Sequence, residues 1–396
     1  MDDFYKTIGQ VADIFDGPHA TPVKTDVGPY FLSISSLEKG RLNLSKSAHL
    51  SEADFKKWTK RVTPKKGDLL FSYETRLGEA ALMPDGVTAC LGRRMGLLRP
   101  HSDKVISEYL LYAYLSPAFQ QTIIANTITG ATVDRIALNE MIDFPIRIPS
   151  IEDQRKVSEL LKDIDSKIEC NNQIDSEIES TIRFLYNYWF VQFDFPDKNG
   201  RPYKSSGGRM VFSPNLKKDI PEGWCDVLVG DILDKAPAST KVLNQDILEA
   251  GDIPVIDQGQ RYICGFTDDR SSLIQPIKPH VIFGDHTRLL KLVNFQYARG
   301  ADGTQVLISK DSRMPGYLMY QAISNIDLSN YGYARHFKFL KQSIITLSDE
   351  ELAQKYDLLV TPFFEKRREL IFENFELTKL RDWLLPMLIN GQITVS

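Results

Sequence analysis

Apolar residues recur every three or four positions through two long segments of the chain, and this spacing predicts two long amphipathic helices. The first segment spans residues 149–195 and contains no glycine or proline between Ser150 and Phe195. The second spans residues 347–396, and Pro362 within it predicts a kink because proline lacks a backbone donor. Each begins with a serine and acidic residues, which suit the positive end of a helix dipole.

The two apolar stripes predict that these helices pack against each other as an antiparallel coiled coil. Asn171 and Asn172 interrupt the first stripe near its middle, and Arg367 and Arg368 interrupt the second. These polar residues either form a buried layer that fixes the register or face solvent, and the sequence leaves both alternatives open. The residues expected to pack between the helices are Leu161, Ile164, Ile168, Ile178, Ile182, Leu352, Leu359, Phe363, Leu370, Leu377 and Leu380.

The two remaining regions, residues 1–148 and 223–346, predict two similar mixed α/β domains. A connection rich in Pro, Gly, Ser and Lys, residues 196–222, predicts an irregular linker between the halves. The predicted class is α+β, with two similar domains separated by the two long antiparallel helices.

The similarity of the two regions rests on the order of their motifs. Each opens with a short helical segment, passes through short β-like runs and reaches a tyrosine-rich helix. Each then has a glycine with an arginine close behind. The paired features are Ile8–Phe15 and Val229–Leu233, Glu108–Leu115 and Tyr317–Ala322, Gly130 with Arg135, and Gly332 with Arg335.

Charge is unevenly distributed along a chain whose net charge is −4. The two long helical segments carry 5 basic against 10 acidic residues and 6 against 9, whereas residues 1–150 carry 18 against 17. Any contact with phosphate is therefore expected from the domains, and the acidic helices are expected to face protein. The excess of positive charge is small, so this supports nucleic-acid binding only weakly.

Composition also indicates the cellular compartment. The four cysteines, Cys90, Cys170, Cys225 and Cys264, lie far apart without a CxxC motif, which argues against a zinc site or a disulfide framework and suits a reducing cytoplasm. The acidic N-terminus is unlike a signal peptide, and no apolar run approaches the roughly 20 residues of a membrane span. We therefore expect a cytoplasmic protein without a membrane partner.

Several catalytic motifs are absent from the sequence. It has no Gly-Lys dipeptide, which excludes a P-loop, and no G-x-G, which excludes the usual dinucleotide motif. It also lacks the N/D-P-P-Y/F tetrapeptide of amino-methyltransferases, because no two prolines are adjacent. Asp285 and His286 have no nucleophile motif beside them, so a structural histidine or a base contact is more plausible there than a general base. We expect no catalytic residue and no metal ligand.

Side chains suited to reading DNA bases gather in corresponding loops of the two regions. Arginine and lysine suit guanine edges in the major groove, and asparagine and glutamine suit adenine. Each such residue alone is more often an ordinary surface residue than a base contact. The candidates are Lys65, Lys66, Tyr73, Arg76, Arg93, Arg94, Thr132 and Arg135 in the first region, and Gln258, Gln260, Arg261, Tyr262, His286, Arg288, Arg299, Gln305, Arg335 and His336 in the second.

In this order, the motifs resemble the specificity subunit of type I restriction–modification enzymes along the whole chain. GATVDRIALNEMIDFPIRIPSIEDQRKVSELL (130–161) is similar to the family's passage from a target recognition domain into a conserved helix, including Gln154 of its P-x-x-x-x-Q pattern. FPDKNGRPYKSSGGRMVF and the DIPEGW that follows it resemble the family's connection after the central conserved region. The second passage, SDEELAQKY, departs from the pattern because it lacks the proline.

The resemblance implies that two target recognition domains each read one half of a split, asymmetric DNA sequence. It also implies partners: two modification subunits, which use S-adenosylmethionine to methylate adenine N6, and restriction subunits, which use ATP and magnesium. The chain itself is then a non-catalytic recognition subunit without a bound cofactor, cytoplasmic and associated with the nucleoid.

Two other classes of function remain open at this stage. The first is a structural adaptor that joins two enzyme subunits through its helices without reading bases. The second is a self-contained methyltransferase or nuclease, which the missing motifs disfavour. An adaptor predicts that DNA affinity is insensitive to changes at Arg93, Arg94 or Gln260, whereas assembly depends on Leu359 and Ile178.

Overall fold

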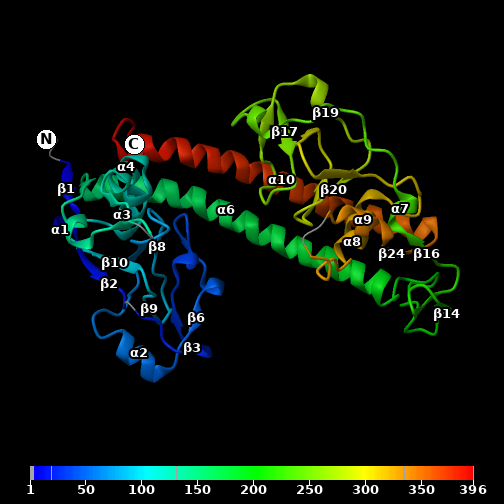
Figure 1. Cartoon of the computed structure of the whole chain (residues 1–396), viewed down its shortest axis with the longest axis horizontal. Helices are drawn as coiled ribbons and strands as arrows, with labels where there is room; N and C mark the ends of the chain where they lie inside the picture. Colours follow the sequence, from blue (N-terminus) through cyan, green and yellow to red (C-terminus); the bar gives the residue numbers. More distant parts are fainter. Residues whose placement is uncertain (1–3, 19, 131–132, 333–334, 396) are drawn as a thin grey trace. The chain divides into compact units, whose positions relative to one another are not determined.

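The computed structural model describes residues 4–18, 20–130, 133–332 and 335–395. The chain forms two compact units. Unit 1 comprises Met1–Cys170 and Asn374–Ser396, and unit 2 comprises Asn171–Glu373. Two long helices, α6 (Ile151–Tyr186) and α10 (Glu350–Ile389), each contribute one part to unit 1 and the other part to unit 2 (Figure 1).

Unit 1 is built on small antiparallel sheets. The largest has the order β2-β10-β7-β8, and a second, β6-β3-β9, contains one parallel pair. Its strands are β1 (Tyr5–Thr7), β2 (Ala12–Asp16), β3 (Thr25–Phe31), β4 (Leu37–Glu38), β5 (Arg41–Leu42), β6 (Ala48–His49), β7 (Leu69–Ser72), β8 (Ala80–Leu82), β9 (Ala89–Cys90), β10 (Met95–Pro100), β11 (Thr127–Ile128), β12 (Arg135–Ile136) and β13 (Pro145–Arg147). Its shorter helices are α1 (Ile8–Val11), α2 (Glu52–Trp58), α3 (Ser107–Leu115), α4 (Pro117–Ala125) and α5 (Leu138–Met141).

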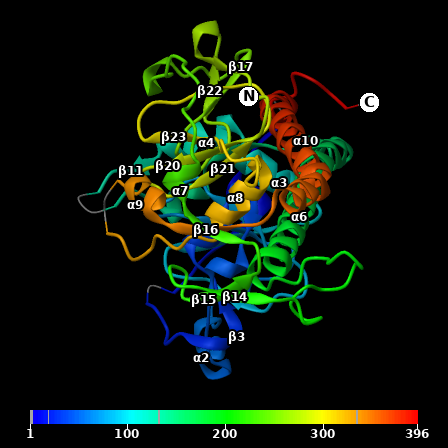
Figure 2. The same ribbon diagram turned by 90° about the vertical axis from the view of Figure 1, so that its right-hand side faces the viewer.

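Unit 2 has two main sheets, β18-β17-β22-β19 and β21-β20-β23, and a separate hairpin of β14 and β15 that follows α6 (Figure 2). Its strands are β14 (Met210–Ser213), β15 (Lys218–Pro221), β16 (Cys225–Leu228), β17 (Ile253–Ile256), β18 (Gly265–Thr267), β19 (Leu273–Ile274), β20 (His280–Gly284), β21 (Leu290–Val293), β22 (Tyr297–Arg299), β23 (Thr304–Leu307) and β24 (Ile344–Leu347). Its shorter helices are α7 (Val229–Ile232), α8 (Gly316–Ser324) and α9 (Phe337–Gln342).

The two units share one plan. In each, the strand before the first one-turn helix pairs antiparallel with the last strand before α6 or α10, β1 with β13 in unit 1 and β16 with β24 in unit 2. A one-turn helix then begins with the same backbone bond, Ile8 N–H to Phe144 O at 3.0 Å in unit 1 and Val229 N–H to Ser343 O at 2.9 Å in unit 2. The predicted α+β class with two similar domains and two long antiparallel helices is confirmed. One detail differs, because residues 12–15, expected to be helical, form β2 by pairing with β10.

Both long helices are capped at their first turn. The Ser150 hydroxyl accepts from the Asp153 N–H at 3.2 Å, as the sequence predicts. In α10 the cap is the Asp349 carboxylate, which accepts from the Leu352 N–H at 2.8 Å, while Ser348 donates to the Asp349 carbonyl. α6 extends into a π-helical segment, η3 (Asn187–Val191), and Pro362 lies within α10 without ending it.

Within each unit, α6 and α10 run antiparallel. In unit 1 the Arg381 guanidinium donates to Asp165 at 2.9 Å. In unit 2, residues further along α6 contact residues nearer the start of α10. The Asn171 amide donates to Glu373 at 2.8 Å, and eleven residues later on α6 the Ile182 carbonyl lies 3.4 Å from the Tyr356 hydroxyl. Asn171 is fully buried and Arg367 pairs with Asp175, so these two polar positions form contacts between the helices, whereas Asn172 is exposed.

The apolar contact on α10 lies along a different line from the expected stripe. Leu352 and Leu370 are buried, but the side chains of Leu359 and Leu380 are 42% and 43% exposed. These two leucines therefore keep a large part of their surface exposed. The buried positions of the first half of α10 are Leu352, Ala353, Tyr356, Val360 and Phe364. On α6 the expected Leu161, Ile164, Ile168 and Ile182 are buried and Ile178 is half-buried, and on α10 the expected Phe363 and Leu377 are half-buried.

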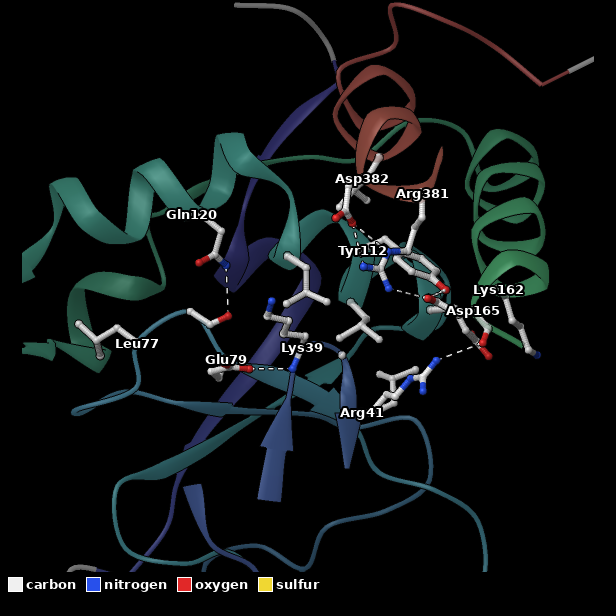
Figure 3. Close-up of a pocket in the computed structure, with 17 residues that line it drawn as sticks. Lys39, Arg41, Leu77, Glu79, Tyr112, Gln120, Lys162, Asp165, Arg381 and Asp382 are labelled. Carbon is white, nitrogen blue, oxygen red and sulfur yellow. Dashed lines mark hydrogen bonds and ion pairs between the residues drawn. The ribbon is translucent and has the colours of Figure 1, made fainter. Parts of the chain in front are cut away.

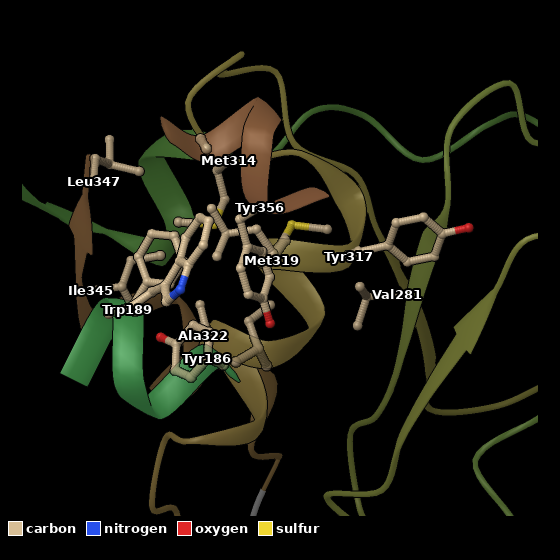
Figure 4. Packing of buried hydrophobic residues seen from close by; sticks show 14 of the residues in the cluster. Tyr186, Trp189, Val281, Met314, Tyr317, Met319, Ala322, Ile345, Leu347 and Tyr356 are labelled. Atoms are coloured by element: carbon tan, nitrogen blue, oxygen red, sulfur yellow. The ribbon is translucent and has the colours of Figure 1, made fainter. Parts of the chain in front are cut away.

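The unit 2 core joins the end of α6, the start of α10 and helix α8. Tyr186 and Trp189 of α6 and η3 surround Tyr356, with ring centres 6.4 and 5.7 Å away, and Met319 of α8 is fully buried beside them (Figure 4). Aromatic side chains bury large areas and favour tilted or edge-on contacts. This aromatic cluster fixes the long helices to the domain of unit 2.

Candidate nucleic-acid interface

Three loop segments meet at one place in unit 1, which we call junction 1: residues 73–76, 92–95 and 134–136. The Tyr73 N–H donates to the Arg94 carbonyl at 3.2 Å, and the Ile136 N–H donates to the Tyr73 carbonyl at 2.9 Å. The turn after β7, the turn before β10 and the segment after Gly130 are therefore held together by backbone bonds. Junction 1 brings together the predicted residues Tyr73, Arg76, Arg93, Arg94 and Arg135.

Unit 2 repeats this arrangement in what we call junction 2: residues 285–288, 300–303 and 335–336. The Asp285 N–H donates to the Gly303 carbonyl at 2.8 Å, and the His336 N–H donates to the Asp285 carbonyl at 2.9 Å. These bonds connect the turn after β20, the turn before β23 and the segment after Gly332. The same backbone junction thus occurs twice with different side chains.

Junction 1 holds two non-glycine residues in the left-handed region of backbone conformation. Thr75 has φ 72° and Arg94 has φ 71°, and the Arg94 guanidinium donates to the Thr75 hydroxyl at 3.2 Å. Such a conformation is unfavourable for a β-branched residue and persists only where surrounding contacts impose it, as at binding sites. The Arg94 side chain also lies 3.0 Å from Glu74. Arg94 therefore braces the junction, whereas Arg93 and Arg135 are exposed beside it.

The other predicted residues of unit 1 have different surroundings. Tyr73 is 5% exposed, its hydroxyl has no hydrogen-bond partner among the described residues, and burial raises its pKa to about 12. Arg76 donates to the Ile34 carbonyl and pairs with Glu79. Lys65 is exposed, and Lys66 is exposed but paired with Asp85 at 2.8 Å; Thr132 lies outside the described residues.

In unit 2, the side chain of Gln258 links three segments. Its amide nitrogen donates to the Asp302 carbonyl at 2.9 Å, and its amide oxygen accepts from the His286 N–H at 3.1 Å. Gly303, with φ 75°, makes room for it, because a Cβ there would lie 2.6 Å from the Gln258 amide nitrogen. Both polar atoms of the Gln258 side chain thus hold junction 2 together.

Lys291 on β21 was not predicted from the sequence. Its side chain is 6% exposed, and its ammonium donates to the Arg261 carbonyl at 2.5 Å and lies 3.4 Å from the Asp257 carboxylate. Asp257 also accepts from the Gly259 N–H at 2.9 Å. Lys291 therefore holds both ends of the loop 257–261, whose Gln260 and Arg261 side chains are exposed. A lone lysine in an apolar strand pattern is the sequence signal for such a buried clamp.

The remaining predicted residues of unit 2 divide into buried and accessible groups. The Tyr262 hydroxyl donates to the Leu292 carbonyl, and the buried ring of His336 donates from Nδ1 to the Asp285 carbonyl at 3.0 Å. Arg288, with φ 62°, is exposed but donates to the Leu328 carbonyl at 3.1 Å. His286 and Arg335 are exposed, whereas Arg299 and Gln305 are half-buried on or next to strands.

Unit 1 also has a pocket of about 530 Å³ between the β4–β5 turn, α3 and the two long helices (Figure 3). Asp165 lines it and binds two other lining residues: its carboxylate accepts from the Tyr112 hydroxyl at 2.8 Å and from Arg381 at 2.9 Å. Arg41 donates to the Asp165 carbonyl at 3.2 Å and pairs with Glu169. These bonds fix the domain of unit 1 to its part of the helix pair.

Within residues 4–18, 20–130, 133–332 and 335–395, no group of three or more His, Cys, Asp or Glu side chains is placed to hold a metal ion. Over the same ranges, none of the helices combines the length and the apolar character that crossing a bilayer requires.

The chain is similar to proteins of one kind over most of its length. Residues 5–180 match the family model described as type I restriction modification DNA specificity domain. The chain is 23% identical over 372 residues to the type I restriction enzyme MjaIX specificity subunit of Methanocaldococcus jannaschii, an alignment that covers 88% of this chain and 82% of that protein. It is 29% identical over 135 residues to the HindI specificity subunit of Haemophilus influenzae, covering 33% of this chain and 29% of that protein.

The fold also matches a solved structure. The S subunit of a type I restriction–modification system from M. genitalium superposes with a TM-score of 0.61 at 16% identity, over 98% of this chain and 97% of that one. At this identity the likeness concerns the fold.

Proposed function

We propose that the chain, which is similar to type I restriction–modification specificity subunits, is such a subunit and reads a bipartite, asymmetric DNA sequence, one half with each unit. The repeated junction is the observation that carries this proposal. Two units with the same backbone bonds and different side chains are suited to two different half-sites. The chain acts without catalysis of its own and without a bound cofactor.

Bases are read by the side chains that the junctions leave exposed. Arg93 and Arg135 in unit 1, and Arg261 and Arg335 in unit 2, present guanidinium groups suited to the O6 and N7 acceptors of guanine. Gln260 presents an amide suited to adenine. The braced residues Arg94, Gln258 and Lys291 keep these side chains in place, which lowers the entropy lost on binding.

Modification subunits dock on the exposed sides of α6 and α10. Four large apolar side chains of α10 are exposed, Leu358 (73%), Leu359 (42%), Leu380 (43%) and Trp383 (56%), and Phe184 of α6 is 65% exposed. Apolar side chains on an otherwise acidic helix are typical of a protein-binding surface. Two modification subunits there use S-adenosylmethionine to methylate adenine N6, and restriction subunits, which use ATP and magnesium, join this assembly.

A chimera tests the proposal. Residues 1–148 are replaced by the corresponding region of another specificity subunit, the complex with modification subunits is expressed, and methylated adenines are mapped in genomic DNA. We expect one half of the recognition sequence to change and the other half to stay. The reciprocal replacement of residues 223–346 is the matched control and should change the opposite half. A chimera that keeps both halves unchanged contradicts the proposal.

The alternative function, an adaptor that joins enzyme subunits without reading bases, makes the opposite prediction. Arg93→Ala or Gln260→Ala in the assembled complex then leaves DNA affinity unchanged. For a reader of bases, each substitution weakens binding to the cognate duplex by about 1–3 kcal/mol and relaxes preference at one base pair.

A further inference from the structure

A strongly basic segment of unit 1 contains none of the predicted base-contacting residues except Lys65 and Lys66 at its end. Six of the eleven residues from Lys56 to Lys66 are lysine or arginine, and none is acidic. The segment begins in the last turn of α2. Part of it, with Gly17 and Leu91, lines a pocket of about 500 Å³.

The charge in this pocket is uncompensated. Arg61 donates to both carboxylate oxygens of Asp16, at 2.8 and 2.7 Å, and thereby neutralises the one acid among the described lining residues. Lys57 and Lys60 are exposed, and neither has an ion pair within the described part of the chain. The Lys57 ammonium lies 5.7 Å from the centre of the Trp58 ring. Two lysine charges therefore line the pocket without an acidic partner among the described residues.

Trp58 contributes a second unsatisfied group. Its indole N–H is buried and has no hydrogen-bond partner among the residues that the structure describes. The ring packs against a small apolar cluster of Phe31, Leu50 and Cys90, which holds it in place. A buried donor without an acceptor is unfavourable.

The pocket adjoins junction 1. Gly17, which lines it, donates its N–H to the Met95 carbonyl at 2.8 Å. A Cβ at this position would lie 2.6 Å from the Gly92 carbonyl oxygen, so only glycine permits this approach. The turn Gly92–Met95 is also the one that presents Arg93. The basic pocket and the base-reading edge are thus two sides of one turn.

The geometry points to a phosphate-binding site: Lys57 and Lys60, beside Trp58, hold a backbone phosphate of the DNA whose bases junction 1 reads. This inference rests on the proposed function and adds a contact that carries no sequence information. Phosphate contacts position a protein on DNA, while base contacts specify the sequence. Lysines at the end of α2 also compensate the negative end of that short helix, and this structural role alone would leave DNA binding unchanged.

The test uses Lys57→Gln/Lys60→Gln in the full chain assembled with modification subunits. Affinity for a duplex carrying the mapped recognition sequence, and for one with a single base pair changed, is measured from about 50 to about 200 mM salt. Loss of this one phosphate contact lowers the slope of log affinity against log salt by about 1, so across this range the wild type loses roughly three- to fourfold more affinity than the variant. Both duplexes are expected to be affected by the same factor.

Two control variants accompany it. Lys6→Gln/Lys104→Gln removes the same charge from unit 1 beyond the opposite end of β2, where Lys104 donates to the Gln10 carbonyl, and should keep the wild-type slope. Lys57→Arg/Lys60→Arg keeps the charge and should restore the slope.

Three results overturn the inference: an unchanged slope in the Gln variant, an altered preference between the two duplexes, or weakened assembly with unchanged DNA binding, which indicates an acidic protein surface as the ligand. If the wild-type complex shows no preference between the two duplexes, the proposed function is contradicted. The difference in salt slope between wild type and Lys57→Gln/Lys60→Gln then still tests the phosphate contact at the pocket.

Discussion

At the scale of single residues, the same side-chain types serve two purposes at the junctions. Gln258 and Arg94 were predicted to read bases, yet their polar atoms are engaged in holding loops together. Arg93 and Gln260, of the same residue types, are exposed. Residue type predicts which chemistry a loop contains, but the fold determines whether a side chain points to a neighbouring loop or to solvent.

Lys291→Met tests the positioning role of the buried clamp. Methionine has a similar volume but cannot bind the Arg261 carbonyl or the Asp257 carboxylate, so we expect the loop 257–261 to lose its fixed conformation. Discrimination between cognate and single-substituted duplexes should fall by about 1–2 kcal/mol in one half-site only. Methylation rates on duplexes substituted in either half measure this.

The matched control for the clamp is Lys278→Met, which removes a lysine on the loop before β20. Equal loss of discrimination in both half-sites indicates general destabilisation and contradicts the positioning role. The double variant Asp257→Asn/Lys291→Met removes the unpaired carboxylate and should recover stability without recovering discrimination.

Asp357 on α10 predicts a pH-dependent term in stability. Its carboxylate accepts from the N–H groups of Tyr317 and Leu318 at 3.1 and 3.2 Å, but burial raises its pKa to about 6. Between about pH 4 and 6 the folded chain therefore binds more protons here than the unfolded chain, and the free energy of unfolding falls as pH rises through that window. The residue contributes up to about 3 kcal/mol of this change.

Asp357→Asn keeps the acceptor and removes the charge. The difference in unfolding free energy between this variant and the wild type should shift in favour of the variant from pH 4 to pH 7, measured by denaturant unfolding. The comparison must use the difference, because burial lowers the pKa of His280 to about 4 and makes stability fall as pH drops from about 6.5. A difference that is constant with pH contradicts the assignment.

At the scale of elements, the two long helices depend on polar contacts as well as apolar ones. The Arg367 guanidinium, whose side chain is 16% exposed, donates to Asp175 at 2.7 and 3.2 Å and to Glu179 at 3.2 Å. Three such polar contacts, at Asp165, Asn171 and Arg367, lie between apolar layers of α6 and α10. A shift of either helix by one turn would leave these groups unpaired, so they define the register.

Arg367→Met should lower the free energy of unfolding by about 1–3 kcal/mol, because it leaves partly buried carboxylates without their partner. The neighbouring Lys366→Met is the control, since its pair with Glu369 is about half exposed and should contribute less than about 1 kcal/mol. Denaturant unfolding of both variants measures the contrast. Equal effects mean that the Arg367 contacts do not specify the helix pair.

The elements were more predictable than the register between them. Periodicity located both long helices, the tyrosine-rich helices and the paired order of motifs in the two domains. It misplaced part of the stripe on α10, because Leu359 and the buried Val360 are adjacent and both apolar. The candidate site was predictable as a set of loops. Its bracing by Lys291 and the pocket at Lys57 depend on long-range contacts that no local pattern contains.

At the scale of the whole molecule, charge separates two kinds of surface. The domains carry the exposed arginines and the basic pocket, whereas the long helices carry excess acid together with exposed apolar side chains. Binding to phosphate releases counterions and weakens steeply with salt, whereas burial of apolar surface does not. The two proposed interactions should therefore respond differently to salt in the same complex.

We predict that raising salt from about 50 to about 200 mM weakens DNA binding by tenfold or more and leaves association with modification subunits nearly unchanged.

Trp383→Glu should have the converse effect and weaken subunit association by at least about 2 kcal/mol, because a large exposed aromatic is a typical interface anchor. Lys379→Gln, one turn away with the same change in net charge, should leave association intact. Light scattering measures assembly, and fluorescence anisotropy with labelled duplex measures DNA binding. If salt dissociates the subunits and Trp383→Glu does not, charge rather than apolar contact holds the complex, and the docking surface lies elsewhere on the chain.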